Sequence, residues 1–269
     1  MAAGLDGVEV GGLHVAFRRA GAGPPLVLLH GAPGDSRAWH PQLDGLADEF
    51  TVIAWDAPGH GGSSDPPESW RLPDYADCLA GMINGLGLER PHVLGLSFGG
   101  ALALQLFGRH PRLPASLVLA SAYAGWAGSL PAEVVEERLQ RVLRDSEREP
   151  EPVAREFATT LFDDNTPPQL VEELVAIMAE FHPVGWRTVS RGLAESDLRA
   201  LLPRVDVPTL LLYGDADKRS PLAVARDLKA ALPGAPLVII PGVGHMTNLE
   251  APERFNREVR EFLRSVQES

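Results

Sequence analysis

Short apolar runs alternate along this chain with amphipathic segments of helical spacing, and this alternation constrains the fold more than any other feature. Runs so short and so continuously apolar are typical of strands buried on both faces. Strands separated by helices predict an α/β fold, with a mostly parallel central sheet and helices on both of its faces. The runs span residues 26–29, 51–55, 92–96, 116–120, 209–213 and 237–240.

Two segments have the spacing of helices that pack on such a sheet. Residues 73–86 and 253–266 each carry their apolar side chains on one helical face. Residues 8–18 alternate loosely around a pair of glycines, which predicts a hairpin at the sheet edge. Cys78 is the single cysteine, so it forms no internal disulfide, and its apolar helical neighbours predict a buried side chain without chemistry.

The alternation stops between residues 123 and 202, where no strand-like run occurs and Arg, Glu and Pro are abundant. This pattern predicts a helical insertion at 123–202 into a core made of residues 1–122 and 203–269. Prolines, which end helices, mark the boundaries between its expected helices. These helices are expected at residues 132–145, 152–161, 168–181 and 185–195.

Composition and charge exclude several classes of protein. Apolar residues make up 45% of the chain and charged residues 22%, which is typical of a soluble globular protein. The net charge of −12 predicts repulsion from nucleic acids and from anionic membranes. The first residues lack the basic and apolar regions of a signal peptide, so a cytoplasmic location is expected. Residues 91–108 and 113–132 are free of charge, but their Gly, Pro and Ser argue against membrane spans.

A glycine-rich string, Gly95-Leu96-Ser97-Phe98-Gly99-Gly100, begins at the end of the apolar run at 92–96 and leads into a predicted helix. A serine at a tight strand-to-helix turn takes a strained backbone conformation, and Gly95 and Gly99 leave room for neighbouring chain segments. The turn lifts the Ser97 hydroxyl off the sheet. The helix N-terminus directs free amides, above all that of Phe98, at negative charge developing there. The context predicts that Ser97 is a nucleophile.

A serine nucleophile needs a base, and the base needs an acid that holds it in the right tautomer. Gly214-Asp215-Ala216-Asp217 follows the run at 209–213, and Pro241-Gly242-Val243-Gly244-His245 follows the run at 237–240. The carboxyl ends of parallel strands meet at one edge of a sheet. Ser97, Asp217 and His245 are therefore expected to converge there, in the chain order Ser, Asp, His.

With these residues in place, the chain resembles the α/β-hydrolase fold family over nearly its whole length, and specifically the lid-bearing hydrolases that include esterases, enol-lactonases and carbon–carbon bond hydrolases. The resemblance implies that the insertion is a lid and that Ala32 donates the second oxyanion-hole amide beside that of Phe98. It selects Asp217 as the acid over Asp215, whose side chain can organise the turn. It rests on His30-Gly31-Ala32-Pro33-Gly34, Asp56-Ala57-Pro58-Gly59-His60-Gly61, the Ser97 string, Gly214 to Asp217, and Gly244-His245.

The other histidines are interpreted as structural. His30 is expected to pack beside the oxyanion loop and His60 to lie in a glycine-rich loop. Of the rest, only His182, in the lid, is placed to line the site. None belongs to a metal-binding pattern, so neither a metal nor a cofactor is expected. The segments at 182–186 and 194–198 are similar to the end of the lid in enol-lactonases and related esterases.

The resemblance implies a serine hydrolase that cleaves a carboxylic ester or lactone through an acyl-enzyme on Ser97. A serine at the strand-to-helix turn, where related dehalogenases and epoxide hydrolases carry aspartate, argues against those chemistries. The motifs also differ in sequence from those of proline iminopeptidases. Carbon–carbon bond hydrolysis, perhydrolysis or a cofactor-free lyase on the same triad remain alternatives, as does a non-catalytic ligand receptor.

The lid is expected to set substrate choice. The sequence assigns no arginine or lysine to the pocket, so a small to medium uncharged ester or lactone is the expected substrate. The sequence leaves the oligomeric state open. The lid and its neighbourhood offer candidate lining residues, although aromatic and Met side chains at helical spacing also make core. These candidates are Trp126, Phe162, Met178, Trp186 and Met246.

Overall fold

The described strands form one sheet in the computed structural model, which describes residues 4–162, 165–232 and 234–268. The strand order is β1-β2-β4-β3-β5-β6-β7-β8. The first two pairs in this order are antiparallel and all others are parallel, so the predicted α/β class is confirmed. The strands are β1 (Leu5–Val10), β2 (Leu13–Ala20), β3 (Pro25–Leu29), β4 (Thr51–Trp55), β5 (His92–Leu96), β6 (Ser116–Ala120), β7 (Thr209–Gly214) and β8 (Leu237–Ile240).

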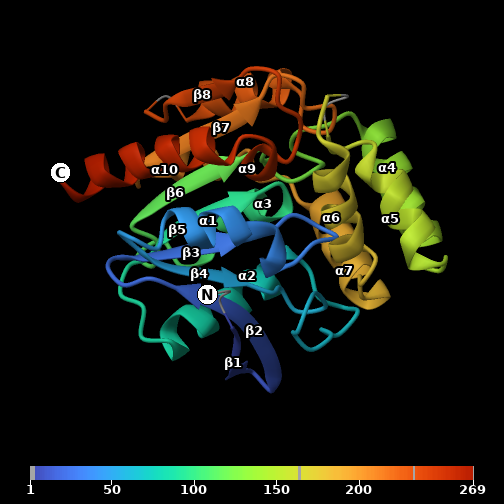
Figure 1. Ribbon diagram of the computed structural model, residues 1–269, viewed down its shortest axis with the longest axis horizontal. Coiled ribbons are helices and arrows are strands. Elements are labelled where there is room, and N and C mark those ends of the chain that lie inside the picture. The colour runs from blue at the N-terminus through green and yellow to red at the C-terminus, as the bar shows by residue number, and fades with distance from the viewer. Residues whose placement is uncertain (1–3, 163–164, 233, 269) are drawn as a thin grey trace.

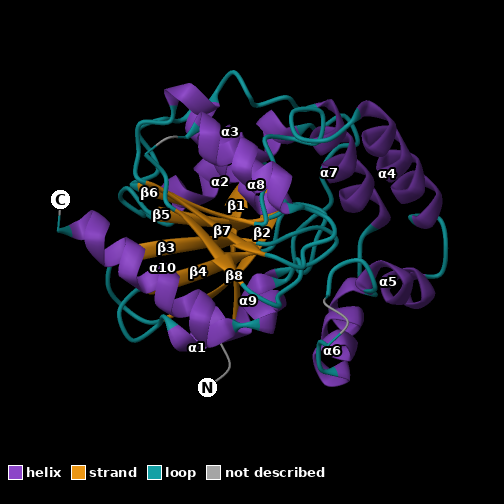
Figure 2. Ribbon diagram, turned by 90° about the horizontal axis from the view of Figure 1, so that it is seen from above, coloured by secondary structure: helices purple, strands orange, loops and turns teal. Residues whose placement is uncertain are grey.

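Helices cover both faces of the sheet (Figure 2). One face carries α2 (Leu72–Gly85), α3 (Phe98–Arg109) and α8 (Leu222–Ala231), and the other carries α1 (His40–Gly45), α9 (Thr247–Glu250) and α10 (Pro252–Gln267). Successive side chains of a strand point to opposite faces. In β3, Val27 and Leu29 accordingly join the apolar cluster under α2 and α3, while Leu26 and Leu28 join the other cluster. Burial on both faces explains the continuously apolar runs of the sequence.

Four further helices lie between β6 and β7 in the described chain, and they gather beside one end of the sheet (Figure 1). They are α4 (Ala132–Asp145), α5 (Pro150–Ala158), α6 (Pro168–Met178) and α7 (Pro183–Glu195). Together with their connections they are called the insert below. Prolines stand at or next to the start of each helix, where a missing amide hydrogen costs nothing. The helices predicted at 132–145 and 185–195 match α4 and α7 closely.

The insert is tied to the core by backbone contact and by ion pairs. A Cβ atom on Gly185, at the start of α7, would lie 2.0 Å from the carbonyl oxygen of Gly59, so only glycine permits this approach. Along the same helix, Glu195 pairs with Arg71 at 2.7 Å and Arg187 pairs with Glu68 at 2.7 Å. These contacts fix α7 against the loops that follow β4.

The structure bears out the predicted edge hairpin, which is β1 and β2 paired across Gly11 and Gly12. Cys78 lies buried in α2, as its neighbours predict. The sequence pattern does not indicate α1, α8 or α9, each of ten residues or fewer. Helices this short are held by packing on the sheet and not by their own periodicity. In the part of the chain that the structure describes, no helix is long and apolar enough to span a membrane.

Candidate active site

Ser97 occupies the turn between β5 and α3. Its φ of 56° and ψ of −111° lie outside the regions that L-residues favour, so the turn is held in place by its surroundings. A Cβ atom on Gly95 would lie 2.1 Å from the Gly99 carbonyl oxygen, and one on Gly99 would lie 2.1 Å from the carbonyl oxygen of Leu29. Both positions therefore require glycine. The turn sets Ser97 before the first turn of α3, where backbone amides have no intrahelical acceptor.

Asp217 and His245 meet at the same edge of the sheet, in the loops after β7 and β8. The Nδ1 atom of His245 donates to the Asp217 carboxylate, at 2.8 Å from Oδ2 and 3.0 Å from Oδ1. The Oδ1 atom also accepts the backbone amides of Arg219 and Ser220, each at 2.8 Å. Both side chains of the pair are buried. Four donor contacts thus fix the carboxylate. Because His245 uses Nδ1 for this pair, its Nε2 atom points away from Asp217.

The environment keeps Asp217 ionised. Burial alone would raise the pKa of the Asp217 carboxyl, but the charge and hydrogen bond of His245 act in the opposite direction. The Ser220 and Arg219 amides add to this, and the pKa falls below its ordinary value. An ionised Asp217 stabilises positive charge on His245, which is what a base needs when it accepts a proton.

Asp215, the alternative acid, does not contact His245. Its Oδ1 atom accepts the backbone amide of Gly242 at 2.6 Å, and the side chain is exposed. Asp215 therefore joins the loop after β7 to the loop after β8. This contact is the turn-organising role that the sequence allows for it.

The loop at 30–34 runs beside Ser97. A Cβ atom on Gly31 would lie 3.4 Å from the Cβ atom of Ser97. The carbonyl oxygen of Gly31 accepts from His30 Nδ1 at 2.9 Å and from the Gly34 amide at 2.9 Å. In a trans peptide the carbonyl and the next amide point in opposite directions. Two donors on the Gly31 carbonyl therefore also fix the direction of the Ala32 amide.

His30 and His60 are buried in contact with each other, with ring centroids 5.1 Å apart. His30 Nε2 accepts the Ala57 amide at 3.0 Å, so this ring is neutral and bridges two loops. Burial lowers the pKa of His30. Burial and the neighbouring His30 hold the pKa of His60 well below its ordinary range. Neither ring lies at the position of the base.

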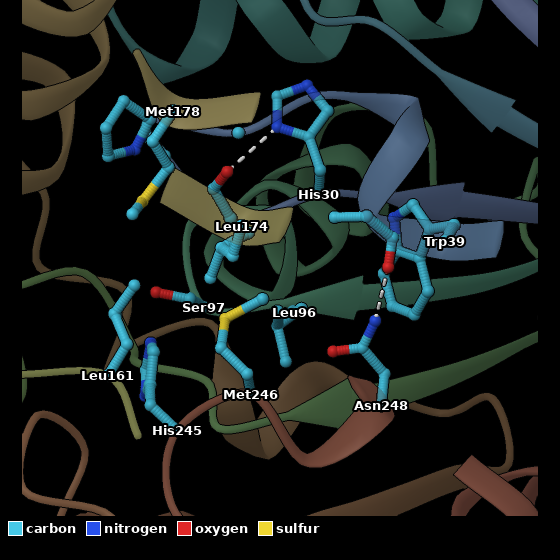
Figure 3. Close-up of a pocket in the computed structure, with 15 residues that line it drawn as sticks. His30, Trp39, Leu96, Ser97, Leu161, Leu174, Met178, His245, Met246 and Asn248 are labelled. Atoms are coloured by element: carbon cyan, nitrogen blue, oxygen red, sulfur yellow. Dashed lines mark hydrogen bonds between the residues drawn. The ribbon is translucent and has the colours of Figure 1, made fainter. Parts of the chain in front are cut away.

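A cavity with about 410 Å³ of empty space opens beside Ser97 and His245 (Figure 3). Its walls are mostly apolar. Figure 3 shows the Ser97 hydroxyl and the His245 ring facing the same space, with Leu161, Leu174 and Met246 around them. Leu161 and Leu174 belong to the insert, so the insert forms one wall of this cavity, which is called the His245 cavity below.

A second cavity, with about 290 Å³ of empty space, meets the first at Ala32 and Ser97. The insert supplies much of its lining through Phe157, Trp186 and Ser190. The core supplies Phe98 and Arg219, and His245 is not part of this lining. This space is called the Arg219 cavity below. Ser97 thus stands between two differently lined spaces.

Four of the five lining candidates from the sequence border these cavities. Met178 and Met246 line the His245 cavity, and Trp126 and Trp186 line the Arg219 cavity. Phe162 borders neither, which corrects that expectation: it is buried in the apolar cluster that the insert shares with the core, and its neighbour Leu161 takes the lining position. His182 is also absent from both linings and pairs with Asp65 at 2.8 Å.

The sequence misses several lining residues, above all Arg219. It stands two positions after Asp217, but only its contact with the insert sets its direction, and no sequence signal carries that contact. Trp39 and Asn248 of the His245 cavity are missed for the same reason. Among the described residues, no group of three His, Cys, Asp or Glu side chains is placed to hold a metal ion.

The chain matches the model of the alpha/beta hydrolase family over residues 26–258. It is 32% identical to a thermophilic esterase from Thermogutta terrifontis, whose structure it matches with a TM-score of 0.89 over 98% of this chain and 99% of that one. It is 26% identical to 3-oxoadipate enol-lactonase 1 of Acinetobacter baylyi, over 91% of this chain and 90% of the relative. It is also 26% identical to 2-(acetamidomethylene)succinate hydrolase of Mesorhizobium japonicum, over 95% and 94%.

Proposed function

Since the chain belongs to the alpha/beta hydrolase family, we propose that it is a serine hydrolase that cleaves a carboxylic ester or lactone through an acyl-enzyme on Ser97. The observation that carries the proposal is the buried hydrogen bond between His245 Nδ1 and the Asp217 carboxylate, in a cavity that also exposes Ser97. An esterase and an enol-lactonase among the similar proteins support the same class of substrate.

In the first step the Oγ atom of Ser97 attacks the carbonyl carbon, and His245 takes the hydroxyl proton. Asp217 stabilises the imidazolium that forms. The amides of Ala32 and Phe98 hold the negative charge on the carbonyl oxygen, because both residues border the space around Ser97. Collapse of the tetrahedral intermediate breaks the ester C–O bond, and the alcohol leaves with the proton from His245. Water, activated by the same histidine, then hydrolyses the acyl-enzyme.

We further propose that residues 123–202 act as a lid over the core formed by residues 1–122 and 203–269. The insert provides walls to both cavities, through Leu161 and Leu174 on one side and Phe157 and Trp186 on the other. A cover of this kind excludes water from the acyl-enzyme and shapes the space for the substrate. The substrate in this proposal is a small molecule, and the chemistry needs neither a metal nor a cofactor.

The test is the initial rate on p-nitrophenyl esters of increasing acyl length, with the purified protein and its Ser97→Ala variant side by side. The wild-type protein should turn over and the variant should lose several orders of magnitude in kcat while remaining folded. An active, folded Ser97→Ala protein would remove the serine mechanism. If neither protein is active on these esters, then lactones, carbon–carbon bond substrates, perhydrolysis, a lyase reaction or a receptor role would be favoured.

A further inference from the structure

Arg219 lines a cavity beside Ser97, and its guanidinium lies next to Phe157, which lines the same cavity. Arg219 and Ser97 line the same space. In the structure Arg219 Nη1 donates to the hydroxyl of Thr160 at 3.2 Å, and the guanidinium lies over the ring of Phe157, 4.5 Å from its centroid. Both partners are uncharged groups of the insert. A guanidinium carries several N–H donors in a planar fork, so most of its bonding capacity is left over.

No carboxylate of the described chain forms an ion pair with Arg219. The Asp217 carboxylate accepts the backbone amide of Arg219, and its other contacts serve His245 and Ser220. By contrast, arginines on the outer surface of the insert are paired: Arg155, for example, binds Glu172 at 2.5 Å. The charge of Asp217 attracts that of Arg219 without direct contact between the two side chains. A partly buried guanidinium without a paired carboxylate is costly, and a ligand carboxylate would reduce that cost.

A second guanidinium, that of Arg138, lies next to Arg219 outside the cavity lining. Arg138, on α4, donates to the backbone carbonyl of Arg219 at 2.9 Å and to the hydroxyl of Tyr123 at 3.2 Å. Like Arg219, it takes part in no ion pair with the described residues. Burial, with the charge of Arg138 acting in the same direction, lowers the pKa of Arg219 to about 10. Arg219 is therefore still a cation at neutral pH.

The two cavities at Ser97 are suited to different parts of an ester. The leaving alcohol must receive its proton from His245, so it occupies the cavity that His245 lines. The acyl group then extends to the other side of the carbonyl carbon, into the Arg219 cavity, beside the Phe98 amide. Arg219 thus faces the acyl part of the substrate and not the alcohol.

We propose that Arg219 binds a carboxylate at the far end of the acyl group, so that the preferred substrates are monoesters of short dicarboxylic acids. This inference rests on the proposed serine hydrolase function. A carboxylate matches the planar fork of a guanidinium and can accept two of its N–H groups. The Arg219 cavity leaves little room between its side chains in the structure, which limits the acyl chain to a short one. The proposed substrate is therefore anionic and replaces the uncharged ester or lactone that is expected from the sequence.

The experiment compares matched substrates that differ only in the terminal group. Monomethyl succinate, glutarate and adipate are tested against methyl butanoate, pentanoate and hexanoate, with methanol release as the readout. We expect the best monomethyl ester to exceed its neutral counterpart in kcat/KM by about tenfold or more, because hydrogen bonds to charged groups are worth about 1.5–3 kcal/mol. Glutarate should also inhibit hydrolysis of the neutral esters more strongly than pentanoate does.

Variants then assign the preference to Arg219. In Arg219→Met, the ratio of kcat/KM between the monomethyl and the neutral ester should fall by about 10- to 100-fold, mainly through KM. Arg219→Lys keeps the charge without the fork and should retain part of the preference. The matched control is Arg155→Gln, an exposed guanidinium on the same insert, which should keep the wild-type ratio.

Each outcome decides the inference. Equal or faster hydrolysis of the neutral esters by the wild-type protein would overturn the carboxylate site and leave the serine hydrolase intact. An unchanged substrate ratio in Arg219→Met would do the same, and the wild-type comparison stands even if this variant does not fold. If no ester of either series is hydrolysed but a lactone is, the serine hydrolase function stands and the inference falls. If neither esters nor lactones are hydrolysed, the proposed function fails and the inference falls with it.

Discussion

The backbone amide of His245 donates a hydrogen bond of 2.7 Å to the carbonyl oxygen of Leu161. Leu161 belongs to the insert and lines the His245 cavity. One segment of the insert therefore both covers the reacting serine and holds the backbone of the proposed base. His245 is fixed from two sides, because Asp217 holds its ring and Leu161 holds its main chain. Displacement of the insert is expected to disturb the base as well as the pocket.

The first prediction tests this link through Gly185→Ala. The added methyl group would lie 2.0 Å from the Gly59 carbonyl oxygen, so α7 must move away from the core. Overpacking of this kind costs about 1–3 kcal/mol, and the free energy of unfolding should fall by this amount. Hydrogen exchange at residues 241–250 should also become faster, since the Leu161 contact loosens. Denaturant unfolding and exchange mass spectrometry measure the two effects.

Gly85→Ala is the control for the first prediction. Gly85 lies at the end of α2, and a Cβ atom there would lie 3.4 Å from a methyl group of Val8, an ordinary contact. This variant should keep wild-type exchange at residues 241–250. Identical exchange in the two alanine variants would show that the insert and His245 move independently.

The second prediction separates the two aspartates of the loop after β7. Asp217→Asn removes the charge beside His245 and favours the wrong tautomer, so kcat should fall by about 10⁴-fold. Asp215→Asn keeps an oxygen that can accept the Gly242 amide, and kcat should remain within a few fold of the wild-type value. Steady-state rates on one ester measure both variants. A larger loss of kcat in Asp215→Asn than in Asp217→Asn would show that Asp215, and not Asp217, acts as the acid.

Much of the fold could be predicted because burial on both faces leaves a strong sequence signal. β4, β5, β6 and β8 begin and end where the apolar runs do. The helices expected at 152–161 and 168–181 each end three residues beyond α5 and α6, since prolines mark starts better than apolar periodicity marks ends. The start at 168 is exact, whereas α5 starts two residues before the expected 152. The short helices α1, α8 and α9 leave no comparable periodicity, since the sheet stabilises them.

The candidate site divides in the same way. Ser97, Asp217 and His245 each follow a strand, so the order of strands alone predicts their meeting at one edge. The lining depends on how the insert packs, which periodicity does not encode. Phe162 and Leu161 are adjacent and both apolar, yet only Leu161 borders the His245 cavity. Arg219 shows the same limit, because Phe157 and Thr160 of the insert determine where its side chain lies.

The third prediction concerns stability against pH. His30, His60 and His92 are buried, and burial lowers the pKa of each below the ordinary value of 6.5. Below that pH the unfolded chain binds protons that the folded chain does not. The free energy of unfolding is therefore at its full value above pH 6.5. It falls as the pH drops from there to the folded pKa of each histidine, by at most about 1.4 kcal/mol per pH unit for each of them.

Urea unfolding at pH 7.5, 6.5 and 5.5 measures this slope. His60→Gln should reduce it between pH 6.5 and 5.5, because one buried titrating group is removed. Carboxylates with lowered pKa values, such as Asp217, lose their contribution to stability only below their ordinary pKa of about 4. They therefore do not affect the slope between pH 7.5 and 5.5. A flat stability profile from pH 7.5 to 5.5 would contradict the prediction.

The fourth prediction concerns the thiol. Burial raises the pKa of Cys78 to about 12, so almost none of it is thiolate at pH 8. The folded protein should therefore react with a disulfide reagent only as fast as it opens, and the protein in denaturant should react at once. A stoichiometric reaction of the native protein within seconds would show that α2 opens readily.

The last prediction concerns the backbone amide of Ala32. A substitution at position 32 cannot remove this amide, but a substitution of His30 can free it to change direction. His30 donates to the Gly31 carbonyl and accepts the Ala57 amide. His30→Leu loses both contacts, and the Gly31–Ala32 peptide can then rotate away from the developing oxyanion. Loss of one oxyanion donor costs about 10²–10³ in kcat, so a loosened donor should cost up to about 100-fold, with a smaller change in KM.

His30→Gln offers a donor and an acceptor on one side chain and should recover part of kcat. If His30→Leu only lost stability, fewer molecules would be active and the kcat of each active molecule would be unchanged. Titration of the active sites separates this explanation from a lower kcat. Unchanged kcat in a folded His30→Leu protein would mean that the Ala32 amide does not hold the oxyanion.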